Sequence, residues 1–194
     1  DEIDSSGRIV KATVYGTEVP EYAFAYQGTA LVSVTLPENL KKINSRAFER
    51  ASKLEFDSLP NSITEIKDKA FQVCTSLRLT SLPDQLETLG TSAFGNADIF
   101  TNLSIPESVR SINAYAFSNS NSLQNVTFKG KPSVVRDLVF YNCPKLTTIN
   151  LDGVDFIREG AFYGCSSLET VNLMDGVVIE DWAFSKTPYA SMNP

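Results

Sequence analysis

Three cysteines have the widest range of chemistry in this chain, because a thiol can bind a metal ion, form a disulfide or act as a nucleophile. Cys74, Cys143 and Cys165 form no CxxC pair, and the chain contains no histidine to complete a zinc site. Each cysteine comes three residues after a phenylalanine. The same position elsewhere holds mostly small residues: Gln27, Ala51, Ala97, Ser120 and Thr187. We therefore expect buried structural thiols, no metal site and no cofactor, with a disulfide between Cys143 and Cys165 as the alternative.

Carboxylates are the other groups that could catalyse a reaction, since a pair of them can cleave a glycosidic bond. Glu38, Asp84 and Glu107 fall at turn positions, where a solvated rim is expected. The lack of histidine also removes the usual general base and the middle member of a Ser-His-Asp triad. The sequence therefore predicts that the chain is not an enzyme, and a carboxylate-dependent hydrolase is the weakest function considered.

Net charge and hydropathy restrict the partners of the chain. Its 194 residues include 17 Lys and Arg against 23 Asp and Glu, for a net charge of −6. No basic cluster is present, so binding to nucleic acid is disfavoured. No apolar run approaches the roughly 18 residues of a membrane helix, so we expect no direct insertion of this chain into a bilayer. Residues 1–7 lack the features of a signal peptide and are expected to be a mature or trimmed terminus.

One short motif recurs along the chain. An Ala-Phe pair, replaced once by Val139-Phe140, places phenylalanines 22 to 24 residues apart, at Phe24, Phe48, Phe71, Phe94, Phe117, Phe140, Phe162 and Phe184. An aliphatic residue stands five positions before each phenylalanine, as Ile66 does before Phe71. Two more large apolar residues follow at fixed spacing, as Leu77 and Leu82 do. Such a constant period indicates a stacked repeat.

The length of the repeat decides the fold class. A unit of about 23 residues cannot bury its apolar face alone, so successive units must stack and share one core. Each unit contains a short alternating segment, such as residues 123–128, whose Val, Thr and Phe content favours a strand. The segment through Ala-Phe is too short for a full helix, so we expect a second short strand and a single helical turn. The sequence predicts a β-rich repeat solenoid of about eight coils of 22–24 residues with short parallel strands.

The unit resembles the leucine-rich repeat of the BspA-like bacterial surface-protein family. Residues 61–77 carry the pattern as Asn-Ser-Ile-Thr-Glu-Ile-Lys-Asp-Lys-Ala-Phe-Gln-Val-Cys-Thr-Ser-Leu. The resemblance implies a right-handed leucine-rich-repeat superhelix with a strand-lined concave face. It also implies a secreted or surface-attached protein of host-associated bacteria and protozoa, associated with adhesion and with binding to protein partners, host extracellular ones among them. Val139, Pro132, Phe56 and Leu79 depart from the pattern, so the local geometry stays open there.

The limits of the repeat divide the chain into three parts. Residues 17–187 form the predicted solenoid. Residues 1–16 contain an alternating segment and are expected to serve as an N-terminal capping strand or partial repeat, since a solenoid end must cover its core and strand edge. Residues 188–194 are expected to form a C-terminal tail or a truncated cap, because Pro188 stops continued pairing.

Polar residues follow the alternation of the predicted strands. The candidate partner-binding face consists of Ser33, Thr35, Ser58, Ser81, Asn102, Ser104, Asn125, Thr127, Thr148, Asn150, Thr170 and Asn172. If the intervening apolar residues point inward, these side chains form two parallel ladders of hydroxyl and amide groups. The alternative is that Ser and Thr simply suit a hydrated strand face.

Phe56 and Leu79 interrupt these ladders in neighbouring units. Asp57 and Thr80 occupy the usual inward positions there, so we expect Phe56 and Leu79 to turn inward through a bulge. The alternative is that they are exposed anchors for a partner.

The leading functional hypothesis is a non-catalytic, adhesin-like binding module that engages a protein or glycan partner through its concave strand face. The repeat and the polar ladders motivate it, while an extracellular or cell-surface location follows only from the family resemblance. The alternative is a structural spacer that projects another domain from the cell surface. We expect a monomer.

Overall fold

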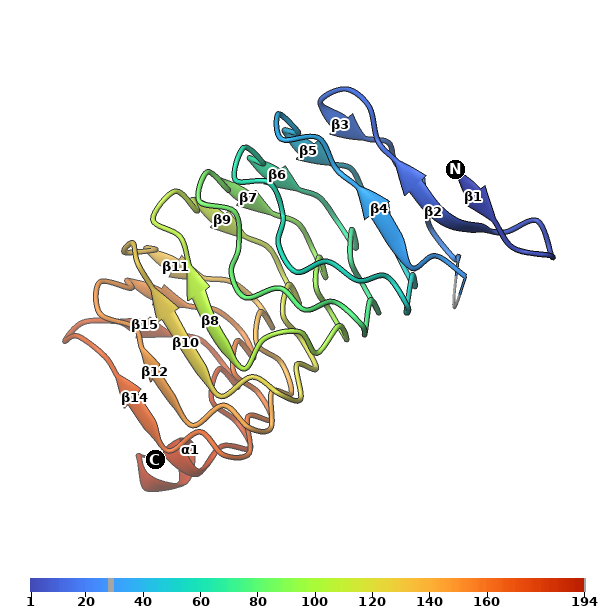
Figure 1. Cartoon of the computed structure of the whole chain (residues 1–194). Helices are drawn as coiled ribbons and strands as arrows, with labels where there is room; N and C mark the ends of the chain where they lie inside the picture. Colours follow the sequence, from blue (N-terminus) through green and yellow to red (C-terminus); the bar gives the residue numbers. More distant parts are fainter. Residues whose placement is uncertain (28–29, 194) are drawn as a thin grey trace.

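The computed structural model describes residues 1–27 and 30–193 and is shown in Figure 1. The chain forms a β-solenoid of about 7 turns, built mostly from parallel strands with little helix. The predicted solenoid is confirmed, but the prediction of about eight coils is corrected to about 7 turns. The difference arises because a turn runs from one Phe to the next, so eight copies of the motif delimit one turn fewer than their number.

The longer strands form what we call the first strand face (Figure 1). One three-stranded sheet has the order β1-β2-β4, and one four-stranded sheet has the order β14-β12-β10-β8. The strands are β1 (Glu2–Ile3), β2 (Ile9–Thr13), β4 (Ser33–Thr35), β8 (Asn102–Ile105), β10 (Asn125–Phe128), β12 (Thr148–Asn150) and β14 (Thr170–Asn172). All their pairings are parallel except that of β1 with β2.

Two-residue strands form what we call the second strand face. A five-stranded sheet contains β3 (Glu18–Val19), β5 (Lys42–Ile43), β6 (Glu65–Ile66), β7 (Thr88–Leu89) and β9 (Ser111–Ile112). A separate three-stranded sheet contains β11 (Val134–Val135), β13 (Phe156–Ile157) and β15 (Val178–Ile179). The second residue of each strand is the aliphatic residue of the repeat, and in six of the eight, β9 and β15 excepted, it is buried. The alternation of a strand therefore fixes the first residue outward.

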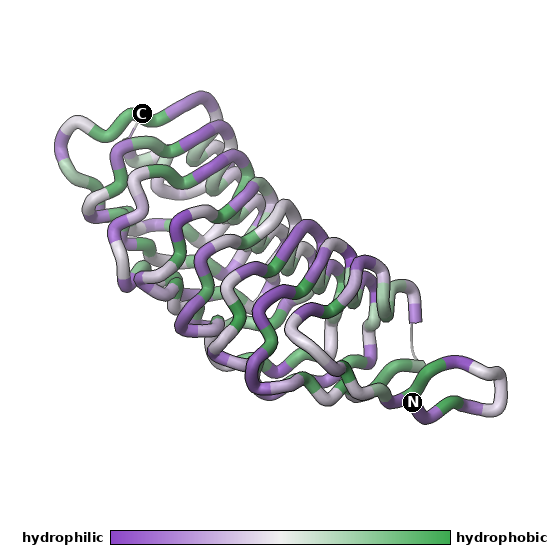
Figure 2. The backbone as a smooth tube through the Cα atoms, turned by 90° about the horizontal axis from the view of Figure 1, so that it is seen from above, coloured by the Kyte–Doolittle hydropathy of each residue, from purple (hydrophilic) through white to green (hydrophobic). Residues whose placement is uncertain are grey.

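The phenylalanines of the repeat stack in a column through the core. Their ring centroids lie 5.2 Å apart for Phe48–Phe71 and Phe71–Phe94, with interplanar angles of 4° and 6°. Burial of each ring contributes about 1.5–3 kcal/mol, and stacking adds about 0.5–1.5 kcal/mol. Figure 2 shows hydrophobic residues at matching places of successive coils. The column is thus the continuous core that the period of the sequence predicts.

The segment around each phenylalanine corrects one detail of the predicted fold. A single helical turn was expected, but the chain makes successive turns closed by bonds such as Ala47 N–H to Asn44 C=O at 3.2 Å. Arg46 and Arg50, two residues on either side of Phe48, have φ of 56° and 62°. Such left-handed residues prevent a helix from continuing. They also direct alternate N–H groups to the next coil, as Phe48 N–H donates to Ala70 C=O at 2.9 Å.

Both ends of the stack carry elements that the sequence reasoning missed. β2 was expected as a strand and pairs in register with β4, but the antiparallel β1 was not expected, and its hairpin with β2 extends beyond the stack (Figures 1 and 2). At the other end, α1 (Pro188–Met192) begins after the N-cap Thr187. The Tyr189 ring packs edge-on against Phe184, with centroids 5.1 Å apart. Residue 194 of the expected tail lies outside the described residues.

Candidate functional site

The outward side chains of β8, β10, β12 and β14 form two aligned polar columns. Parallel pairing places Asn102 beside Asn125, Asn125 beside Thr148 and Thr148 beside Thr170. Ser104 pairs with Thr127 in the second column, and Asn150 with Asn172. We call these residues the polar strand face: Asn102, Ser104, Asn125, Thr127, Thr148, Asn150, Thr170 and Asn172. All are exposed except the half-buried Ser104.

Buried neighbours hold these polar side chains outward. Leu103, Val126 and Ile149 alternate with them along β8, β10 and β12 and are buried in the core. The Asn125 Nδ2 group donates a hydrogen bond to Asn102 Oδ1 at 2.8 Å. Each of these amides keeps its other polar atom for a ligand. The face is therefore a rigid array of donors and acceptors.

The other four candidate residues do not join this array. Ser33 and Thr35 lie on β4, which belongs to the separate sheet β1-β2-β4. Ser58 and Ser81 are exposed but lie outside the strands. The ladders are interrupted between β4 and β8, at the units of Phe56 and Leu79, where residues 36–101 form no strand on the first strand face.

Phe56 and Leu79 cause the interruption. Their side chains are 8% and 3% exposed, so both point inward, as the sequence predicts. The Phe56 ring packs edge-on against Phe48 and Phe71, with centroids 5.7 and 6.3 Å away. Moving these apolar residues inward changes the alternation by one position and takes the backbone out of register with its neighbours.

Two hollows flank the interruption, and the sequence reasoning missed both. One has a volume of about 430 Å³ and lies over Phe56, with Glu38, Ser58, Asn61 and Ser81 among its polar lining residues. The other has a volume of about 370 Å³ and is lined by residues 78–80 and 99–102. The sequence signal for this irregular part was the polar Asp57 and Thr80, which stand where other units place a buried apolar residue. The first strand face therefore combines a regular polar array with a recessed, irregular part.

The cysteines are buried structural groups, as predicted. All three are free thiols, and each donates a hydrogen bond to a phenylalanine carbonyl of the preceding coil: Cys74 to Phe48, Cys143 to Phe117 and Cys165 to Phe140, at 2.9, 3.3 and 3.2 Å. Burial raises the pKa of Cys74 to about 12. A hydrogen bond with Cys165, together with burial, raises the pKa of Cys143. Both shifts keep the thiols protonated and poorly nucleophilic at neutral pH.

The three turn carboxylates singled out from the sequence lie at the rim of the solenoid and far apart along the chain. Glu38, Asp84 and Glu107 are exposed at equivalent turns. The carbonyls of Glu38 and Asp84 accept hydrogen bonds from Ser62 and Ser108 of the following coils, at 2.6 and 2.8 Å. Residues 1–27 and 30–193 contain no group of three or more His, Cys, Asp or Glu arranged to hold a metal ion.

The same described residues contain no helix long and apolar enough to cross a membrane.

Comparison with known proteins identifies the repeat. The family model for the BspA type leucine rich repeat region matches residues 13–101 and 87–193 in 6 copies. A leucine-rich repeat protein from Bacteroides ovatus superposes with a TM-score of 0.84 at 26% identity, over 92% of this chain and 49% of that protein. The leucine rich repeat protein of T. pallidum superposes with a TM-score of 0.62 at 25% identity, over 89% of this chain and 74% of its own.

No curated protein matches the chain. The chain spans about half the length of the Bacteroides ovatus protein, at 49%.

Proposed function

The chain belongs to the BspA-type leucine-rich repeat family, and we propose that it is a non-catalytic binding module whose polar strand face engages a protein or glycan partner. One observation carries this proposal. Eight polar side chains project from four paired strands in register, and seven of them are exposed. A leucine-rich-repeat solenoid is generally a non-enzymatic scaffold, which supports a binding role.

The rigidity of the face favours recognition through many weak hydrogen bonds. Association is costly when side chains and loops must be ordered, and a preorganised surface avoids much of that cost. The strands here are held by ladder bonds and by buried Leu103, Val126 and Ile149 beneath them. Hydroxyl and amide groups donate and accept, so the face suits the backbone and side chains of a protein and the hydroxyls of a glycan.

The family resemblance supports a location at the cell surface or outside the cell, and an adhesin-like role there. The repeats form part of a longer chain in the Bacteroides ovatus protein.

A structural spacer is the second candidate, and the phenylalanine column favours it. The rings stack from Phe24 to Phe184 with centroid separations of 5.2 to 5.9 Å, which makes the solenoid a stiff rod. A spacer needs this rod but needs no particular surface chemistry. Substitutions on the polar strand face therefore distinguish the two functions.

The test replaces Asn102, Asn125, Thr127 and Thr148 with Glu. An array of glycans and matrix proteins first identifies a ligand, and titration then compares the variant with the parent chain. We expect binding about 100-fold weaker or lost, because four charges would stand among the contacts and cost a few kcal/mol. Far-ultraviolet circular dichroism and the urea midpoint should stay close to those of the parent.

The matched control carries the same charge on and beside strands β3, β6 and β7 of the second strand face, with Thr17, Thr64, Thr88 and Thr91 replaced by Glu. This variant should bind as the parent does. Full binding by the polar-face variant would refute the assignment of the face. Failure of every array ligand to bind the parent chain would favour the spacer.

A further inference from the structure

The second strand face changes its chemistry part-way along the solenoid. Outward residues of the five-stranded sheet are charged or polar: Glu18, Lys42, Glu65, Thr88 and Ser111. The outward residues of β11, β13 and β15 are Val134, Phe156 and Val178. Phe156 is 38% exposed and Val178 is 49% exposed. We call these three residues the apolar strip. The change occurs where one sheet ends and the next begins.

The same position is a break in the backbone ladder. In preceding coils the N–H groups of Arg110 and Ser111 both donate to the Glu87 carbonyl, at 2.9 and 3.2 Å. By that pattern Ser133 and Val134 would donate to the Arg110 carbonyl, but among the described residues no backbone bond joins β9 to β11. Across this break the rings of Phe117 and Phe140 are 5.7 Å apart, against 5.2 Å for Phe71–Phe94. The preceding pair, Phe94–Phe117, is 5.9 Å apart although its coils pair through β7 and β9.

Pro132 accounts for the break. It stands four residues after Phe128, where other coils place Leu40, Ile63 and Leu86, all fully buried. The proline ring is smaller than leucine and its fixed φ restricts the approach of β11 to β9. The space that an aliphatic side chain fills elsewhere is left as a crevice.

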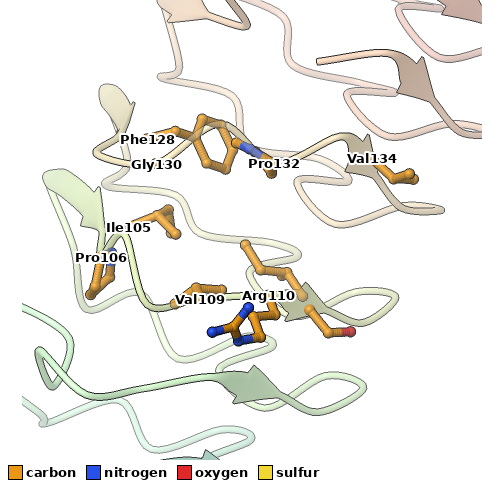
Figure 3. A pocket seen from close by; sticks show the side chains of 10 residues that line it. Ile105, Pro106, Val109, Arg110, Phe128, Gly130, Pro132 and Val134 are labelled. Carbon is orange, nitrogen blue, oxygen red and sulfur yellow. The ribbon is translucent and has the colours of Figure 1, made fainter. Parts of the chain in front are cut away.

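The crevice lies between two coils, and Val134 of the apolar strip is among its lining residues (Figure 3). Ile105, Val109 and Ile112 line one side, and Phe128, Pro132 and Val134 line the other. Ile112 is half-buried here, whereas Ile43, Ile66 and Leu89 at the same position are fully buried. The free volume is about 20 Å³, so the crevice admits the tip of one aliphatic side chain and excludes an aromatic ring. Val134 belongs to both features and makes them one surface.

Two arginines flank this apolar surface. Arg110 lines the crevice and Arg136 lines its continuation towards Phe140. Both are exposed, and neither has an ion-pair partner among the described residues. Arg158, by contrast, pairs with Glu180 and lies 5.4 Å above the Phe156 ring. In a chain of net charge −6, two cations beside an apolar crevice favour an acidic occupant.

We propose that the crevice and the apolar strip form a docking surface for an extended acidic peptide segment of a partner protein. One aliphatic side chain of the segment enters between Ile112 and Pro132. A second apolar side chain, two residues further on, lies on Val134 and Phe156, because alternate residues of an extended chain share one face. Carboxylates of the segment pair with Arg110 and Arg136. This surface is separate from the polar strand face and its role does not depend on the function proposed for that face.

The experiment uses the full chain and a fluorescein-labelled peptide of sequence Asp-Glu-Ile-Thr-Phe-Glu, with binding followed by fluorescence anisotropy at low salt. We expect saturable binding. The double variant R110E/R136E should bind about tenfold more weakly or worse, since two attractions become repulsions. The matched control R50E/K53E reverses two exposed cations elsewhere and should bind as the parent does. A peptide with Ser in place of Ile and Phe should lose most of its affinity.

Several outcomes would overturn the proposal. One is no saturable binding of the peptide by the parent chain. Another is equal binding by R110E/R136E, or equal binding of the serine peptide, which would show attraction by charge alone. Sedimentation of the parent chain as a dimer that R110E/R136E dissociates would assign the surface to a second copy instead. Alanine variants of the polar strand face add no charge and should leave this assay unchanged, so failure here is distinct from failure of the proposed function.

Discussion

The solenoid loses its regular ladder at two places, and they differ in how the core responds. On the first strand face, Phe56 and Leu79 turn inward and remain buried, and Phe56 packs against the rings of Phe48 and Phe71. On the second strand face, Pro132 replaces a core aliphatic residue and leaves a crevice beside Ile112. Beneath the first interruption, Phe48–Phe71 and Phe71–Phe94 are each 5.2 Å apart, while Phe117–Phe140, across the second interruption, are 5.7 Å apart.

The comparison separates two contributions to stacking. Strand pairing is lost at both places, so ladder bonds alone do not set the distance between coils. Where a large side chain fills the core, the phenylalanine column keeps its spacing despite the missing ladder. The widest separation, 5.9 Å for Phe94–Phe117, lies between coils whose strands β7 and β9 remain paired. In this chain, ring spacing and backbone pairing therefore vary independently.

The largest expected effect comes from emptying the first interruption. The substitution Phe56→Ala should lower the free energy of unfolding by about 3–4 kcal/mol, because it removes a buried ring and leaves a cavity. Urea denaturation followed by circular dichroism measures the change. Phe56→Leu is the control and should recover most of the loss. A loss under about 1 kcal/mol for Phe56→Ala would show that Phe56 does not support the coils.

An intermediate effect should report how dry the core is beneath the first interruption. Cys74 lies in this coil with a pKa of about 12 in the folded protein, against an ordinary value of 9.0. Because the pKa of Cys74 is higher in the folded than in the unfolded protein, the free energy of unfolding falls as pH rises from 9 towards 12. The fall is about 1.4 kcal/mol per pH unit, and below pH 9 this thiol causes no loss. Urea midpoints of the parent chain and of Cys74→Ala at pH 8 and pH 10.5 measure this. Equal alkaline losses in both proteins would contradict a dry core at Cys74.

The smallest expected effect comes from filling the second interruption. Pro132→Leu restores the core residue of the other coils and should stabilise the fold by about 1 kcal/mol through added apolar burial. Hydrogen exchange should slow at the N–H groups of Ser133 and Arg136, which would gain partners on the coil that carries β9. Pro132→Ala serves as the control, because it frees the backbone without filling the crevice. Protection gained equally by Pro132→Ala would assign the break to the fixed φ of proline rather than to missing volume.

Most of the fold could be predicted from the repeat, because eight phenylalanines spaced 22 to 24 residues apart require the repeats to stack with their rings in a central column. The inward placement of Phe56 and Leu79 was also predictable, because Asp57 and Thr80 occupy positions that must otherwise be buried. Pro132 was visible as a departure from the pattern, but its consequence was not. The turns around each phenylalanine were mistaken for a helical turn, because left-handed residues such as Arg46 and Val73 carry no sequence signal for that conformation.

The candidate site was predictable only in part. The polar side chains of β8, β10, β12 and β14 could be identified from the sequence, because successive side chains of a strand point to opposite faces. Whether neighbouring coils align those side chains into a column depends on contacts with the coils on either side. Ser58 and Ser81 obey the same local pattern yet lie outside the strands.

The sequence by itself determined that this chain stacks short units on a column of phenylalanines, because period and hydropathy are properties of each unit and its copies. Only the tertiary structure decided where the sheets break, which polar side chains line up and where a crevice opens. Those features depend on how side chains from two neighbouring units pack against each other, which no single unit specifies.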